Sequence, residues 1–241
     1  MRLLLTPLFA TLTLANTLEL WPGQISTFLA TPQTTASEPT SIILLIPDIY
    51  GHNSTATKTL AQKISTLSNL IVVVPDVFEG EPIPEGGAPS FPPGWQDRHG
   101  PAQVERVLDL TLAEVKRRWG EVKVGATGYC FGGRYVFRYL SAGKIAAGVA
   151  AHPSSTTIDE IVGAKGPIQI ATAATDPSFP PAIRQQAEAA LAEKVPYEMN
   201  TYGGVGHGFA VRASDPSDRR DVYALESAAE NAVAWFKFWL E

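Results

Sequence analysis

Short, almost uninterrupted apolar runs alternate with amphipathic helical patterns along most of this chain of 241 residues. The runs cover residues 42–46, 70–74, 122–126, 145–151 and 168–173, and a further strand is expected at residues 197–202. Continuous apolar runs are typical of strands covered on both faces of a parallel sheet. The helical patterns lie around residues 60–67, 104–119, 134–140, 182–193 and 225–240. We therefore predict one doubly wound α/β domain with a mostly parallel central sheet and helices on both faces.

Composition and charge exclude several classes of protein. Hydrophobic residues make up 45% of the chain and charged residues 18%, which is typical of a globular protein and not of a disordered one. The single cysteine cannot form an intramolecular disulfide and rules out a metal site built from paired cysteines. Because the net charge is −5 and no basic run is present, we expect neither nucleic acid nor an anionic membrane as a partner. The chain has no HExxH motif, no clustered metal ligands and no GxGxxG turn after the first strand, so we expect no metal and no cofactor.

The first residues differ from the rest of the chain. Arg2 precedes a moderately apolar stretch that ends at Leu14. This stretch is too short to span a bilayer, so we expect no stable membrane insertion. Two interpretations stay open: an arm or strand that packs on the domain, or a secretory signal. We assign residues 1–22 to this extension and residues 23–241 to the domain, and we favour a cytoplasmic protein with secretion as the alternative.

Residues 78–100 interrupt the α/β pattern. This segment holds five prolines and five glycines, a composition that opposes both helix and sheet. It follows the carboxyl end of a predicted strand, which is the edge where open α/β sheets bind ligands. We predict that it lines or covers the active site; a surface excursion is the alternative.

The sequence Gly-Tyr-Cys-Phe-Gly-Gly at residues 128–133 lies directly between a predicted strand and a predicted helix. It matches the G-x-S-x-G nucleophile elbow with cysteine in place of serine. The glycines permit a sharp turn that presents Cys130 at a helix N-terminus, where the helix dipole stabilises a thiolate. We predict that Cys130 is a nucleophile; a buried apolar thiol is the alternative.

A nucleophile on this fold needs a histidine base and an acid, in the chain order nucleophile, acid, histidine. His207 lies in a glycine-rich loop after the strand predicted at residues 197–202, so we predict that it is the base. Asp176 ends an apolar run at a strand's carboxyl end, and we predict that it orients His207. The alternative for Asp176 is a helix cap or an Asp-Pro turn.

Taken together, these motifs resemble the dienelactone hydrolase family, a branch of the α/β-hydrolases with a cysteine nucleophile. The resemblance rests on Pro-Asp-Ile-Tyr-Gly at 47–51, Val-Pro-Asp at 74–76, the elbow at 128–133, Asp176, and Gly-His-Gly-Phe at 206–209. It covers residues 23–241. It implies a compact α/β-hydrolase fold without a large cap domain, and it places Cys130, Asp176 and His207 at the family's triad positions.

The resemblance also assigns roles around the nucleophile. Asp48 takes the place of a carboxylate that pairs with the nucleophile in the resting enzyme, although the bacterial enzymes carry the longer glutamate there. Its alternative role is to cap the helix that begins near Ser54. The amides of Ile49 and Phe131 are expected to form the oxyanion hole.

Family members that act on dienelactone hold the substrate carboxylate with arginines. Arg212, which closely follows His207, and Arg98, in the proline-rich segment, are the candidates here, because a guanidinium pairs well with a carboxylate.

We therefore predict a cofactor-independent hydrolase of a small-molecule ester or lactone, acting through a Cys–His–Asp triad and a thioester as a monomer or homodimer. One alternative is a thioesterase or a lactone-forming or isomerising enzyme of secondary metabolism on the same fold. The other is an interaction protein that has kept the scaffold without catalysis.

Overall fold

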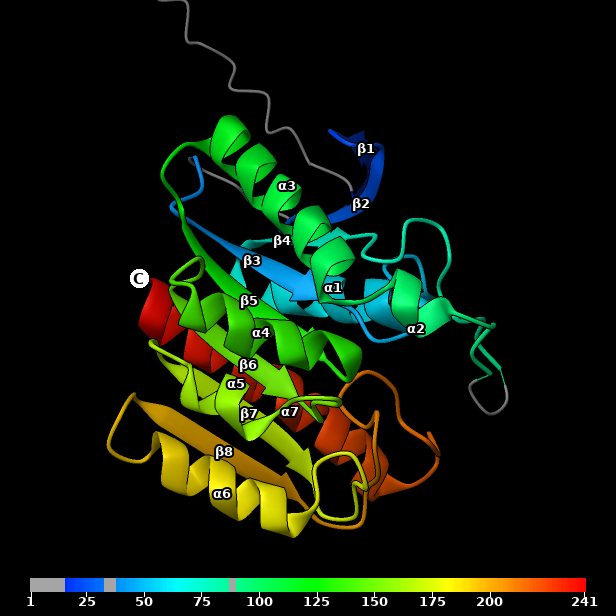
Figure 1. The fold of residues 1–241 in the computed structure, drawn as a ribbon, viewed down its shortest axis with the longest axis vertical. Helices are drawn as coiled ribbons and strands as arrows, with labels where there is room; N and C mark the ends of the chain where they lie inside the picture. The colour runs from blue at the N-terminus through cyan, green and yellow to red at the C-terminus, as the bar shows by residue number, and fades with distance from the viewer. Residues whose placement is uncertain (1–15, 33–37, 87–89) are drawn as a thin grey trace, which may run out of the picture.

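The computed structural model describes residues 16–32, 38–86 and 90–241, in which eight strands form one sheet. Along the sheet the order is β1-β2-β4-β3-β5-β6-β7-β8; β1, β2 and β4 pair antiparallel and all other neighbours pair parallel (Figure 1). The strands are β1 (Thr17–Trp21), β2 (Ile25–Ala30), β3 (Ser41–Ile46), β4 (Ile71–Pro75), β5 (Lys123–Tyr129), β6 (Ala147–Ala151), β7 (Ile168–Ala173) and β8 (Tyr197–Tyr202). The predicted α/β architecture is confirmed.

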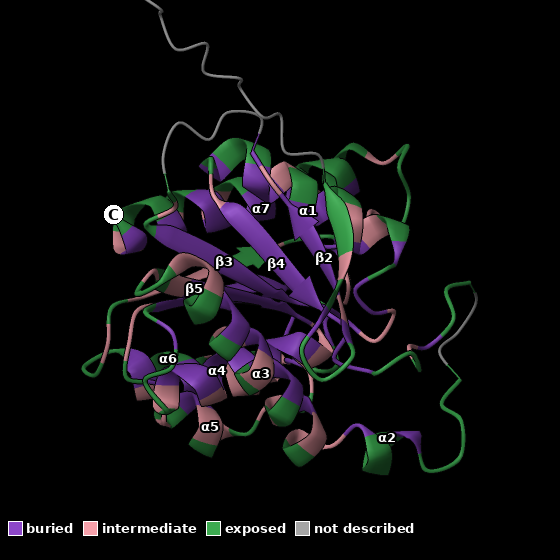
Figure 2. Ribbon diagram, turned by 90° about the horizontal axis from the view of Figure 1, so that it is seen from above, coloured by how far each residue is buried: buried purple, intermediate pink, exposed green. Residues whose placement is uncertain are grey.

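Helices cover both faces of the sheet. Helices α1 and α7 lie on one face, and α3, α4, α5 and α6 lie on the other (Figure 2). The helices are α1 (Thr55–Ser68), α2 (Trp95–Arg98), α3 (Pro101–Trp119), α4 (Phe131–Ser141), α5 (Ile158–Val162), α6 (Pro181–Leu191) and α7 (Arg219–Leu240). No cap domain is inserted between the strands in the described part of the chain.

Each face of the sheet has its own apolar core, and β3 supplies both. Ile42, Leu44 and Ile46 enter the core beneath α3 and α4, while Ile43 and Leu45 enter the core beneath α1 and α7. Successive side chains of a strand point to opposite faces, so a strand covered twice must be apolar at every position. This explains the continuous apolar runs in the sequence.

The sequence did not indicate every element. Strand β2 and the short helices α2 and α5 were not predicted, and a strand near β1 was predicted only as one interpretation of the N-terminal extension. Helix α2 forms inside the segment whose prolines and glycines were expected to exclude helix, because no proline lies within Trp95–Arg98. Strand β1 lies in the predicted N-terminal extension and pairs with β2. The signal-like residues 1–15 lie outside the described residues.

The parallel strands all end at one edge of the sheet (Figure 1). The segments that follow β3, β4, β5, β7 and β8 carry the predicted site residues, so the topology gathers them at this edge. Within the residues that the structure describes, no helix is long and apolar enough to cross a membrane.

Candidate active site

Cys130 occupies a sharp turn between β5 and α4. Its backbone has φ 52° and ψ −111°, a conformation that residues other than glycine rarely adopt. The turn brings the chain close to β3: a Cβ on Gly132 would lie 2.2 Å from the carbonyl oxygen of Ile46. A Cβ on Gly128 would lie 2.3 Å from the carbonyl oxygen of Gly132. Both positions therefore require glycine, as the sequence analysis expected of a nucleophile elbow.

Hydrogen bonds on both sides hold the strained turn. The amide of Cys130 donates to the carbonyl of Ala151, at 3.1 Å, and to Nδ1 of His152, at 3.2 Å. The carbonyl of Cys130 accepts from the amides of Gly133 and Ser154. The half-buried Sγ atom lies 3.5 Å from Oγ of Ser154. The backbone is thus fixed by four partners while the sulfur stays accessible.

Asp176 is buried and pairs with the half-buried His207. Oδ2 of Asp176 lies 2.8 Å from Nδ1 of His207, and Oδ1 accepts from the amide of Ser178, also at 2.8 Å. Burial alone would raise the pKa of Asp176, but the hydrogen bond and charge of His207 outweigh it and lower that pKa. Burial opposes a charged His207, yet hydrogen bonds and charge from Asp176 and Cys130 raise its pKa to about 10.

The amides of Ile49 and Phe131, predicted to form the oxyanion hole, are held in place through the carbonyls of the residues before them, Asp48 and Cys130. A trans peptide points its C=O and N–H in opposite directions. The carbonyl of Asp48 accepts from the amide of Gly51 at 3.0 Å, so the amide of Ile49 points away from that turn. The carbonyl of Cys130 is held by Gly133 and Ser154, which orients the amide of Phe131 in the same way. Among the described residues, neither amide has a protein acceptor.

These groups open into one cavity of about 450 Å³. Cys130, His207, Ile49 and Phe131 all line it. The other lining residues come from α2 and its neighbours, from α4, and from the loops after β6 and β7; they are Phe91, Trp95, Gln96, His99, Gly100, Pro101, Arg134, Tyr135, Ser154, Ser155 and Ser178. The proline-rich segment therefore lines the site, as one of its two interpretations predicted.

A family model described as the dienelactone hydrolase family matches residues 25–240. The chain belongs to this family. It is 36% identical to Hydrolase pyvD of Aspergillus violaceofuscus, over 91% of this chain and 89% of that one. It is also 36% identical to Hydrolase tropI of Talaromyces stipitatus, over 83% and 82% of the two chains.

More distant relatives agree with this assignment. The human carboxymethylenebutenolidase homolog is 26% identical over 82% of each chain. A putative dienelactone hydrolase from Klebsiella pneumoniae has the same fold, with a TM-score of 0.75 and 21% identity over 92% of this chain and 97% of that one. The protein is thus a dienelactone hydrolase-family enzyme that acts on ester or lactone bonds.

In this dienelactone hydrolase relative, Asp48 contacts Arg212 and not the nucleophile. Oδ2 of Asp48 accepts from Nη2 of Arg212 at 2.8 Å, and Oδ1 accepts from the amide of Tyr50 at 3.0 Å. Burial raises the pKa of Asp48, and the charge of Arg212 partly offsets this effect. The structure thus places Asp48 in a tether to Arg212. The side chain of Asp48 is one methylene shorter than that of glutamate. In the described part of the chain it makes no hydrogen bond to Cys130.

The alternative cap role of Asp48 is taken by another residue. Ser54 caps α1, its Oγ accepting from the amide of Thr57. The guanidinium of Arg212 also lies 4.5 Å from the ring of Tyr50.

Arg98 is likewise held by a carboxylate. Its guanidinium contacts Glu81 at 2.9 Å and the carbonyl of Pro93 at 3.1 Å. It does not belong to the residues that line the cavity, and neither does Arg212. Both arginines predicted to bind the substrate are therefore paired within the protein.

Two residues near Cys130 were not predicted as site residues. His152 is fully buried beneath the elbow, and its Nδ1 accepts from Cys130, so its single proton is on Nε2. Burial lowers the pKa of His152 to about 3, and its ring lies 5.0 Å from that of His207. Ser154 has its hydroxyl beside Sγ. The available signal in the sequence was that both residues follow a predicted strand. That signal does not show that His152 accepts from the amide of Cys130 or that Ser154 lies beside Sγ.

His52, a histidine in the loop after β3, lies away from the cavity. Its Nε2 is 2.9 Å from Oγ of Ser26, and its Nδ1 is 3.5 Å from Asp76. It joins the loop after β3 to strands β2 and β4 and does not line the cavity.

Proposed function

We propose that this enzyme hydrolyses its ester or lactone through a Cys130–His207–Asp176 triad with a thioester intermediate. The observation that carries the proposal is the 2.8 Å contact between Asp176 and His207, together with the cavity that His207 and Cys130 share. The strained elbow and the two free amides of Ile49 and Phe131 support it.

In the first half-reaction, the Cys130 thiolate attacks the carbonyl carbon while protonated His207 stands beside it. The electron pair of the C=O bond moves onto oxygen, where the Ile49 and Phe131 amides stabilise it; one such donor contributes about 3–4 kcal/mol in comparable sites. The tetrahedral intermediate expels the alkoxide, which takes the proton from His207. A thioester on Cys130 and a free alcohol result; in a lactone the alcohol stays attached to the acyl group.

In the second half-reaction, neutral His207 takes a proton from water, and the hydroxide attacks the thioester carbonyl. The same amides stabilise the second oxyanion, which collapses and expels the thiolate. His207 is then protonated again beside Cys130. Asp176 holds His207 so that Nε2 faces the reacting groups and stabilises the imidazolium in both steps.

Trapping the intermediate tests this proposal. Intact-protein mass spectrometry after mixing with an activated ester should show one added acyl group in the wild type. The acyl group should be absent from Cys130→Ala, and that variant should be inactive with an unchanged unfolding midpoint. Cys130→Ser should retain little activity, because its hydroxyl is a far weaker acid. An active Cys130→Ala variant would remove the thioester mechanism.

A further inference from the structure

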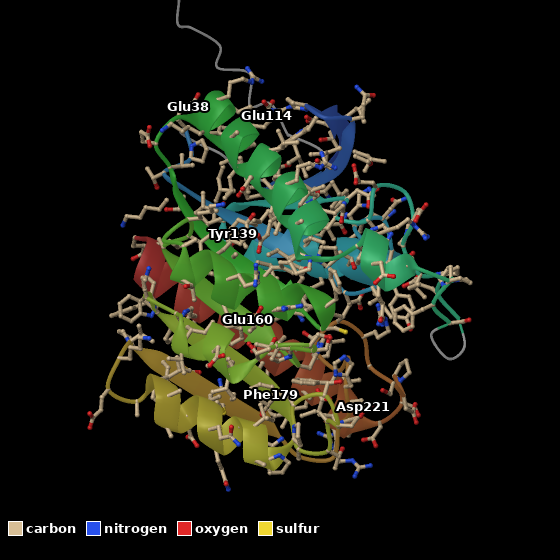
Figure 3. The ribbon with its side chains drawn as sticks, viewed as in Figure 1. Glu38, Glu114, Tyr139, Glu160, Phe179 and Asp221 are labelled. Atoms are coloured by element: carbon tan, nitrogen blue, oxygen red, sulfur yellow. The ribbon has the colours of Figure 1, made fainter. Side chains whose placement is uncertain are left out.

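Three basic side chains line the described part of the cavity, and each of them already has a carboxylate partner. Arg134 on α4 donates to Glu160 on α5 at 2.8 Å, and Figure 3 shows Glu160 between these helices. His207 is paired with Asp176, and Nε2 of His99 lies 3.2 Å from Glu81. In the described part of the site, no basic side chain that lines the cavity is left for a substrate carboxylate.

Arg212 lies outside the cavity, and moving it to a substrate would separate it from the buried carboxylate of Asp48. Its partner Asp48 is only 3% exposed, so moving Arg212 toward a ligand would leave that carboxylate buried without its cation. Breaking a buried pair from one side is strongly unfavourable. We therefore expect Arg212 to stay with Asp48 when the site is occupied.

The wall of the cavity is aromatic. Phe91, Trp95, Phe131 and Tyr135 form a continuous series of rings, with centroids 5.3, 6.1 and 5.3 Å apart in that order. Such tilted arrangements are the ones that aromatic groups prefer, and a further ring can join the series in the same way. Phe91, one of the lining residues, is 43% exposed, so part of its ring is open to solvent.

From these observations we propose that the substrate is a neutral ester or lactone bearing an aromatic ring, which packs against this wall while its carbonyl faces Cys130. The proposal rests on the proposed function and adds the substrate class to it. A cavity of about 450 Å³ is of the size that holds a small organic molecule. A substrate carboxylate would lose its water without gaining an unpaired cation.

Matched esters test the substrate class. The substrates that vary on the acyl side are all 2,2,2-trifluoroethyl esters, so they share one non-aromatic leaving group. Their acyl groups are 3-phenylpropanoate, 3-cyclohexylpropanoate, succinate (as the monoester) and acetate. On the alcohol side, 2-phenylethyl and 2-cyclohexylethyl acetate form the equivalent pair. In at least one pair we expect kcat/KM to favour the phenyl compound about three- to tenfold. The succinate monoester should be at least about tenfold poorer than the phenyl ester.

Variants of the wall link this preference to named rings. Phe91→Leu should lower the phenyl-to-cyclohexyl ratio, and Trp95→Leu should bring it close to one. Trp95 is buried and its Nε1 donates to the carbonyl of Glu81. The unfolding midpoint of the Trp95→Leu variant must therefore be measured. If Trp95→Leu does not fold, the exposed position Phe91 still decides. Phe238→Leu, on α7 and 75% exposed, is the matched control and should leave the ratio unchanged.

The acetate ester separates two kinds of failure. If the acetate ester is hydrolysed but neither pair shows a phenyl preference, the aromatic substrate class is wrong and the hydrolase mechanism stands. The same conclusion follows if the phenyl preference persists in Phe91→Leu and in folded Trp95→Leu. Efficient turnover of the succinate monoester would also overturn the proposal. If no ester acylates Cys130, the proposed function itself fails.

Discussion

Two aspartates in the loops at the carboxyl edge of the sheet make nearly the same local hydrogen bonds. Asp176 and Asp48 are both buried, and each accepts at Oδ1 from the amide two residues further along, at 2.8 and 3.0 Å. Each also contacts a cationic side chain at Oδ2, at 2.8 Å in both cases. The partners differ: Asp176 holds the imidazole of His207, and Asp48 holds the guanidinium of Arg212.

The chemistry of the partner separates the two pairs. An imidazole gains and loses a proton near neutral pH, so an aspartate that orients it also controls a base. A guanidinium stays protonated in proteins, so the same geometry gives a permanent ion pair. We infer that Asp176–His207 is a catalytic pair and Asp48–Arg212 a tether between the loop after β3 and the loop after β8. The predictions below test this difference.

The largest difference is expected from the same substitution made in both pairs. Asp176→Asn removes the charge that stabilises the imidazolium and disturbs the tautomer of His207, so kcat/KM should fall on the order of 10³- to 10⁴-fold. Asp48→Asn keeps an oxygen acceptor for Arg212 and should change kcat/KM by less than about fivefold. Steady-state kinetics on a neutral ester measure both. A comparable loss in Asp48→Asn would give Asp48 a part in catalysis.

The pH dependence of stability should also differ between the pairs. The pKa of His207 is raised from 6.5 to about 10, because Asp176 and Cys130 outweigh the effect of burial. A raised pKa contributes stability that is complete below about pH 6.5 and is lost as the pH rises through about 10, at about 1.4 kcal/mol per pKa unit.

Urea unfolding at about pH 6, 8 and 10 checks this expectation. The stability advantage of the wild type over His207→Gln should shrink across that range. The advantage over Arg212→Gln should stay constant between about pH 8 and 10, because a guanidinium keeps its charge in this range. Parallel profiles for the two variants would contradict the distinction.

A smaller effect is expected from removing each partner of the tether. Arg212→Gln leaves a carboxylate that is only 3% exposed without its cation, and should lower the free energy of unfolding by about 2–3 kcal/mol. Asp48→Asn leaves an arginine whose side chain is 33% exposed and remains solvated, so we expect less than about 1 kcal/mol.

Acidification provides the control for this asymmetry. Burial raises the pKa of Asp48, so its ionised form weakens the fold and its protonation at low pH removes that penalty. The loss in the free energy of unfolding caused by Arg212→Gln should therefore become smaller as the pH falls toward the pKa of Asp48. A deficit that grows on acidification would assign the loss to another contact of Arg212, such as the ring of Tyr50.

The tether also marks where prediction from the sequence ends. The apolar runs predicted five of the eight strands, and a sixth was expected at residues 197–202. Glycine geometry predicted the elbow, because this turn, like the apolar runs, is a local property. The bounds of β1 were not predicted, because most of its residues are exposed and it contains no continuous apolar run. Asp48 and Arg212 were each predicted at the site, but the pair joins loops 164 residues apart. The sequence indicates which residues reach the sheet edge and not which of them satisfy one another there.

The smallest effect concerns substrate choice by Arg212. If Arg212 gripped a substrate carboxylate, Arg212→Gln would damage turnover of a carboxylated ester about ten- to a hundredfold more than that of a neutral one. Because Asp48 already holds Arg212, we expect the two rates to fall together, with their ratio changing by less than about threefold. The ratio cancels any general damage to the loop that carries His207. A selective loss on the carboxylated ester would show that Arg212 leaves Asp48 when substrate binds, and the tether would then be a switch.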